Sequence, residues 1–139
     1  MITAFFLSSA MSEDKSLTVG KKAPRIENIQ GINVGYDANS EAKTRIISFW
    51  NPKNPASRIA NKNLEKLYGN NSDSGIDFIS ICTDSDEKLM EEVMKIDGLR
   101  QENNYSYAQI ARRVFKDYDV EHNPRAFKIG PDGRIVEIL

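Results

Sequence analysis

Cysteine and histidine are almost absent from this sequence, which contains one residue of each type, Cys82 and His122. A single cysteine cannot form an intrachain disulfide, and it excludes a zinc site built from several thiolates. Basic and acidic residues nearly balance, with a formal net charge of −1. This charge gives no reason to expect a nucleic acid or an anionic membrane as a partner. Internal repeats and low-complexity segments are also absent.

Length and composition predict a single globular domain. The chain has 139 residues, which is enough for one hydrophobic core and too few for two domains. With 40% hydrophobic and 28% charged residues, the composition is that of an ordinary soluble protein. We expect the domain to span residues 19–139.

The first 18 residues are expected to be an apolar N-terminal arm or signal remnant, followed by a polar linker. The apolar stretch, residues 2–10, is too short to span a bilayer, which needs about 20 residues. Ser8 and Ala10 are small residues at a cleavage-like site, so the stretch resembles the end of a secretory signal, although no Lys or Arg precedes it. The alternatives are an apolar arm docked on the domain and an artificial extension.

The segment that organises the chain is residues 46–58, which read I-I-S-F-W-N-P-K-N-P-A-S-R. Its first half is rich in β-branched and aromatic residues and predicts a buried strand. Asn54 is a favourable N-cap and Pro55 suits the first helical position, so a helix is expected to begin there. Downstream of this start, apolar residues recur at helical spacing, with Ile59 beside them: Ala56, Ala60, Leu64 and Leu67. Free N–H groups at such a helix start favour an anion.

The remaining elements alternate strands and helices. We predict a short irregular hairpin or extended arm over residues 26–36, and strands over residues 44–50, 76–83, 126–129 and 134–139. Three helices are predicted. The first covers residues 55–68. The second begins after a cap at Asp84 or Ser85, carries an apolar stripe of Leu89, Val93 and Ile96, and ends at Gly98. The third follows a capping box at residues 106–109. Residues 100–105 are expected to be a loop. The first strand–helix–strand unit makes its two strands parallel. Pro131-Asp132-Gly133 predicts the last hairpin turn.

The strand-to-helix segment resembles the active-site segment of the thioredoxin-fold redoxins, in particular envelope thiol:disulfide oxidoreductases and alkyl-hydroperoxide-reductase-like proteins. That family reads F-W-x-x-W-C-x-x-C-R at this place. Phe49-Trp50 and Arg58 match the pattern, but Asn54 and Ser57 stand at the two cysteine positions and Lys53 stands at the second tryptophan position.

The resemblance extends over most of residues 19–139. Residues 20–24 resemble the family's G-x-x-A-P, residues 118–124 its Y-x-V-x-x-x-P, and residues 127–136 its F-x-I-D-P-D-G-K-I-V. It implies an α/β fold, a thioredoxin-like three-layer sandwich whose central mixed β-sheet carries helices on both faces. It also implies that Pro124 is a cis-proline facing the active-site loop. Family members usually have a further helix after the last strand. We therefore expect part of one sheet face to be uncovered, unless the apolar N-terminal arm or a partner covers it.

The residues present limit the chemistry of this site. Disulfide exchange needs a thiolate and, for turnover as a dithiol, a second thiol. Asn54 cannot act as a nucleophile, and Ser57 would need a base. Cys82 lies in an apolar strand, where a cysteine usually behaves as a small hydrophobe. The resemblance would put His122 near Ser57, so a Ser57–His122 pair for acyl transfer is conceivable, although no third group is evident.

We therefore expect a redox-inactive binding or assembly module rather than an enzyme, with no catalytic residue. The family's active-site positions are Trp50, Asn54, Pro55, Ser57 and Pro124, and further groove contacts are Lys53, His122 and Asn123. The expected partner is an extended peptide or a partner protein. The alternatives are an oxidoreductase with single-cysteine chemistry and a hydrolase built on Ser57 and His122. A structural role in a larger envelope complex also stays open.

No cofactor and no metal are expected, because residues 84–87 (D-S-D-E) lack the glycine and the spacing of a calcium loop. The resemblance suggests the bacterial periplasm or cell envelope, with the cytoplasm as the alternative. Oligomeric state is left open.

Overall fold

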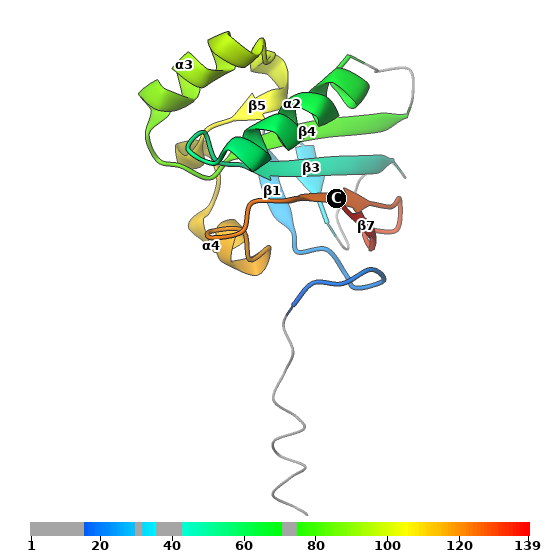
Figure 1. Ribbon diagram of the computed structural model, residues 1–139. Coiled ribbons are helices and arrows are strands. Elements are labelled where there is room, and N and C mark those ends of the chain that lie inside the picture. Colours follow the sequence, from blue (N-terminus) through cyan, green and yellow to red (C-terminus); the bar gives the residue numbers. More distant parts are fainter. Residues whose placement is uncertain (1–15, 30–31, 36–42, 71–74) are drawn as a thin grey trace, which may run out of the picture.

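The computed structural model describes residues 16–29, 32–35, 43–70 and 75–139 (Figure 1). Its centre is a five-stranded mixed sheet in the order β5-β4-β3-β6-β7. The bounds are β3 Thr44–Trp50, β4 Ile76–Cys82, β5 Asn104–Tyr105, β6 Ala126–Ile129 and β7 Ile135–Ile138. Strand β3 pairs parallel with β4, as predicted, and β4 pairs parallel with β5. Strand β6 is antiparallel to both of its neighbours.

Helical elements cover both faces of this sheet, which confirms the predicted three-layer α/β architecture. Helices α2 (Pro55–Tyr68) and α3 (Glu87–Asp97) lie on one face (Figure 1). The other face carries the antiparallel hairpin of β1 (Ile26–Ile29) and β2 (Ile32–Val34), the 3₁₀-helix η3 (Tyr107–Gln109) and helix α4 (Arg112–Asp117). A second 3₁₀-helix, η2 (Gln101–Asn103), leads into β5.

The larger core lies under the hairpin and α4, where four aromatic side chains pack together. The Phe49 ring lies 5.1 Å from the Tyr118 ring and 6.3 Å from the Phe115 ring, centroid to centroid. Phe127 completes the group at 5.2 Å from Tyr118. The Tyr118 hydroxyl donates a 2.6 Å hydrogen bond to the carbonyl of Pro24, which ties the N-terminal lead-in to α4. A smaller core packs Trp50 and Cys82 against α3 residues Met90, Val93 and Met94.

Several expectations for local structure hold and others are wrong. Helix α2 has the predicted bounds, and Gly98 ends α3 with a left-handed φ of 67°. The cap of α3 is Asp86 rather than Asp84 or Ser85, because Asp84 accepts the Asp86 N–H and starts a turn before the helix. Ile96 is 73% exposed, so it does not belong to the buried side of α3. The expected loop before Ser106 contains β5, since tertiary pairing with β4 forms a strand that the polar sequence did not indicate.

Helix α2 turns a polar side to the sheet. Its buried residues are Ser57, Asn61 and Glu65, spaced four apart. Asn61 Oδ1 accepts a 2.9 Å hydrogen bond from the Ser80 hydroxyl of β4. The Glu65 carboxylate accepts the Arg100 N–H at 2.8 Å and the Asn104 side-chain amide at 2.9 Å. The apolar residues of the helix are consequently left toward its outer side, with Ile59 and Leu67 each 63% exposed.

Candidate functional site

The loop between β3 and α2 is fixed by Asn54 and Ser57, which stand where the redoxin motif has its two cysteines. Asn54 Oδ1 accepts the Ser57 N–H at 2.9 Å, so Asn54 is the N-cap of α2, as predicted. The Ser57 hydroxyl accepts the Asn51 N–H at 3.0 Å and lies 3.1 Å from the Asn54 carbonyl and 3.2 Å from the Asn51 carbonyl. Both residues therefore bond to the loop itself, which gives the Ser57 hydroxyl a structural role.

The flanking residues of this loop point to neighbouring elements. The Asn51 side chain accepts the Lys53 N–H at 2.8 Å, and Lys53 Nζ lies 3.3 Å from Asp84 in the β4–α3 loop. Arg58, which matches the family pattern, makes two bonds to the Asp97 carboxylate at 2.8 and 3.1 Å. This hydrogen-bonded pairing raises the pKa of the Arg58 guanidinium. The two ion pairs join the start of α2 to both ends of α3.

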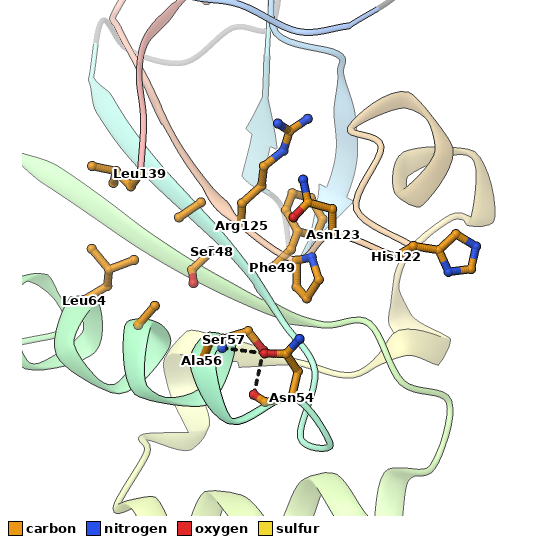
Figure 2. A pocket seen from close by; sticks show the side chains of 13 residues that line it. Ser48, Phe49, Asn54, Ala56, Ser57, Leu64, His122, Asn123, Arg125 and Leu139 are labelled. Carbon is orange, nitrogen blue, oxygen red and sulfur yellow. Dashed lines mark hydrogen bonds between the residues drawn. The ribbon is translucent and has the colours of Figure 1, made fainter.

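A groove of about 240 Å³ lies between α2 and the turn that precedes β6 (Figure 2). Five of the eight sequence-predicted site residues line it: Asn54, Ser57, His122, Asn123 and Pro124. The other three lie elsewhere. Trp50 is fully buried beneath α3, Lys53 is turned to Asp84, and Pro55 lines a separate depression with Arg58 and Asp97.

The groove has a second half that the site prediction missed. It is lined by Ala56, Ala60 and Leu64 of α2, and by Ser48, Ala126 and Leu139. Figure 2 shows Leu139 on the other side of the groove from Ala56 and Leu64. The helical spacing of Ala56, Ala60 and Leu64 was visible in the sequence. Their position opposite Ala126 was not, because it depends on the pairing of β6 with β3.

Ser57 and His122 do not form a reactive pair. The His122 ring is exposed and points away from Ser57 (Figure 2). The Ser57 hydroxyl is occupied by the main chain of Asn51 and Asn54. A serine attacks a carbonyl only when a base takes its proton, and no such contact exists among the described residues.

The expected cis bond before Pro124 is wrong, because the described residues contain no cis peptide bond. An X–Pro bond favours trans by about 0.5–1 kcal/mol unless its surroundings demand cis. Here the trans chain already makes the required contact, since the Arg125 carbonyl accepts the Phe49 N–H at 3.0 Å and joins the turn to β3. Pro124 still lines the groove.

Cys82 is part of the smaller core. It is fully buried, and its Sγ lies 3.5 Å from the Asp84 carbonyl. Burial raises the pKa of the Cys82 thiol to about 11. The thiolate form that disulfide exchange requires is therefore scarce at neutral pH.

The described residues show neither a metal cluster nor a membrane-spanning helix. In the described part of the chain, no group of three His, Cys, Asp or Glu side chains is placed to hold a metal ion. Within those same ranges, no helix combines the length and the apolar character needed to cross a membrane. The proposed N-terminal arm lies mostly in residues 1–15, outside the described residues, so the domain boundary stays a prediction.

Similar structures have the fold that this geometry suggests. No protein-family model and no curated protein matches the sequence. A thioredoxin-like protein from Parabacteroides distasonis is 23% identical, with a TM-score of 0.73 over 88% of each chain. The thioredoxin domain of a thiol-disulfide oxidoreductase from Bacteroides vulgatus is 22% identical, with a TM-score of 0.67 over 88% of this chain and 89% of that one.

A third structure, described as a thiol:disulfide interchange protein DsbE from Chlorobium tepidum, is 16% identical, with a TM-score of 0.65 over 88% of this chain and 85% of that one. Identities this low show the fold alone. The chain therefore has a thioredoxin-like fold, and the resemblance seen in the sequence is confirmed at that level.

Replacing Ser57 with alanine should destabilise the protein by about 1–3 kcal/mol, because the part-buried Asn51 N–H loses its acceptor. Urea unfolding followed by circular dichroism measures the change. Ser85→Ala is the matched control, since Ser85 is exposed and should change stability by less than about 0.5 kcal/mol. Equal effects of the two substitutions would contradict a structural role for the Ser57 hydroxyl.

Cys82 should resist a thiol-directed reagent in the folded protein near pH 8. With the pKa near 11, about one thiol in a thousand is ionised there, and the side chain is buried as well. Absorbance with an aromatic disulfide reagent follows the reaction, which should be slow in buffer, fast in concentrated urea, and faster as the pH rises toward 11. Rapid stoichiometric labelling of the folded chain near pH 8 would refute this.

Proposed function

We propose that this protein is a redox-inactive thioredoxin-like module that binds an extended peptide segment of a partner protein. The observation that carries the proposal is the groove beside Asn54, Ser57 and Pro124, which is present although neither cysteine position holds a thiol. A groove without a nucleophile can still bind an extended peptide through main-chain pairing and side-chain contacts.

The turn at one end of the groove offers main-chain groups to such a peptide. Among the described residues, the main chain of His122 and Asn123 makes no hydrogen bond. Both residues are exposed, so water satisfies these groups in the free protein. An extended peptide could pair with them as a strand would, while its side chains enter the groove.

The size and character of the groove also favour a peptide. Its volume of about 240 Å³ is below the range of roughly 300–1,000 Å³ typical of small-molecule sites. Among its lining side chains, Arg125 is the one with a formal charge, and none is acidic. A few uncharged side chains of a peptide suit this space better than a charged cofactor.

The single-cysteine enzyme is the weaker candidate. Cys82 is buried under α3 with Trp50 and Met90, in a different core cluster from Phe49. It does not line the groove. A substrate disulfide could reach its Sγ only if α3 moved away. The high pKa of the thiol disfavours the reaction further.

Restoring the two thiols should restore chemistry. The Asn54→Cys/Ser57→Cys double variant should accelerate the reduction of insulin disulfides by dithiothreitol, because the first thiol would sit at the start of α2 and its pKa would fall. Turbidity measures the rate. The wild type should match the rate without protein, and the single Asn54→Cys variant should not turn over. Wild-type activity that Cys82→Ala removes would instead establish single-cysteine chemistry.

The binding function is tested with peptides selected from a random displayed library against the wild-type protein. Ala56→Glu places a charged side chain in the groove and should weaken the selected peptides at least tenfold, which is about 1.4 kcal/mol. Ala108→Glu is the control, since Ala108 is also exposed but lies in η3 on the opposite sheet face. Fluorescence anisotropy gives the affinities. Peptides that bind both variants equally would place the binding surface elsewhere.

A further inference from the structure

The apolar half of the groove is an open trough with uncharged walls. We call it the apolar trough and define it by Ala56, Ala60, Leu64, Ala126 and Leu139. Ala56 and Ala60 are exposed, and Leu139 is 44% exposed, so these walls meet solvent in the described structure.

Exposed apolar side chains collect on the two elements that border the trough. Among the described residues, four of the six exposed large hydrophobic side chains belong to α2 or to the β7 end: Ile59, Leu67, Val136 and Leu139. Of these four, Leu139 lines the trough, whereas Ile59 lines the separate depression with Pro55 and Arg58. Single exposed apolar residues are normal on a protein surface, but an apolar hollow that meets solvent can mark a site that something covers.

No charged group enters the trough from its other end. The Arg125 side chain points away from α2, with its guanidinium carbon 5.2 Å from the Phe127 ring centroid (Figure 2). His122 also points outward (Figure 2). The side chains that form the walls of the trough are apolar, and they favour an apolar occupant.

We propose that the apolar trough is the docking site of this chain's own N-terminal arm, residues 2–10. The first 12 residues contain no charged side chain, and four of residues 2–7 are large and apolar: Ile2, Phe5, Phe6 and Leu7. Burying such side chains against alanine and leucine walls is favourable by roughly 25 cal/mol for each Å² of apolar surface removed from water.

The path of the lead-in brings the arm to the correct edge of the sheet. The Gly20 N–H donates to the Ile135 carbonyl at 2.8 Å, and the Ile135 N–H donates to the Lys21 carbonyl at 2.9 Å. The lead-in therefore adjoins β7, and the chain just beyond β7 forms a wall of the trough at Leu139. From Ile135 to Leu139 is about 13 Å of strand. Residues 7–16 can span roughly 30 Å, which is ample.

Docking of the arm within its own chain is favoured over docking from a second copy, because the arm is tethered close to the trough. A short tether holds the arm at an effective concentration in the millimolar range, well above the concentration of a second copy in a dilute sample. The same arm from a second copy satisfies the chemistry equally, so the experiment must separate the two arrangements. Because the experiment uses no partner, its result does not depend on the proposed function.

The test attaches a nitroxide to the arm and reads its distance from the trough. In a Cys82→Ala background, Thr3→Cys carries the label, and amide spectra of the ¹⁵N-labelled full chain are recorded. Resonances of Leu64, Ala126 and Leu139 should lose intensity. Ala60→Arg, which fills the trough, should restore them. Asn63→Arg is the matched control, since Asn63 is exposed on the same helix but does not line the groove, and it should leave the loss unchanged.

A mixed sample identifies the chain that supplies the arm. Spin-labelled chains without ¹⁵N are combined with ¹⁵N chains without the label, and intact mass confirms that the arm is present. Under the proposal, the trough resonances keep their intensity in this mixture. Loss of intensity in the mixture would assign the arm to a second copy and overturn the proposal. Intensity loss elsewhere on the domain, or none at all within the labelled chain, would also overturn it.

Discussion

The contact between α2 and the sheet is the constraint on which the site depends. This helix buries Ser57, Asn61 and Glu65, and buried polar groups destabilise a protein unless they are hydrogen-bonded. Each finds a partner on a different element: the β3–α2 loop, Ser80 of β4, and the chain at Arg100 and Asn104. These bonds are directional, unlike apolar contacts, so they fix both the position and the rotation of α2 about its axis.

The rotation of α2 determines the surface around the groove. Because the polar side of α2 faces the sheet, the side with Ala56, Ala60 and Leu64 lines the groove together with Ala126 and Leu139. The start of the helix is held in turn by Asn54 and by the Arg58–Asp97 pair. The loop, the groove and the apolar trough are therefore consequences of one packing arrangement, and a substitution at Ser57 would affect all three.

Asn54 and Ser57, which stand where the redoxin motif has cysteines, have structural roles in this site. A reactive thiol at a helix start needs to be accessible and to have a lowered pKa. Asn54 and Ser57 instead direct their polar atoms into the loop and saturate its N–H groups. The one thiol of the chain lies in a core where burial raises its pKa. A reactive thiol is favoured neither at the start of α2, which holds Asn54 and Ser57, nor at the buried Cys82.

Local patterns were sufficient for elements whose signals lie within a few residues. The N-cap at Asn54, the proline at the start of α2, the left-handed Gly98 and the Pro131-Asp132-Gly133 turn each depend on neighbouring residues, and each was predictable. The errors share a different cause. β5 forms only by pairing with β4, and the Asp86 cap replaces the earlier candidates because Asp84 is used in a turn.

The sequence by itself determined the alternation of strands and helices, the thioredoxin-like fold and the absence of a second thiol. The alternation and the missing thiol follow from residue order, periodicity and composition, which do not depend on contacts at long range. The fold was implied by the resemblance of several short segments to the redoxin motifs. Only the tertiary structure decided that α2 turns its polar residues inward, that Lys53 turns to Asp84 and the His122 ring points away from Ser57, and that Ala126 and Leu139 line the groove together with the helix. Side-chain direction depends on the partners that packing supplies, and residues far apart in the chain supply those partners.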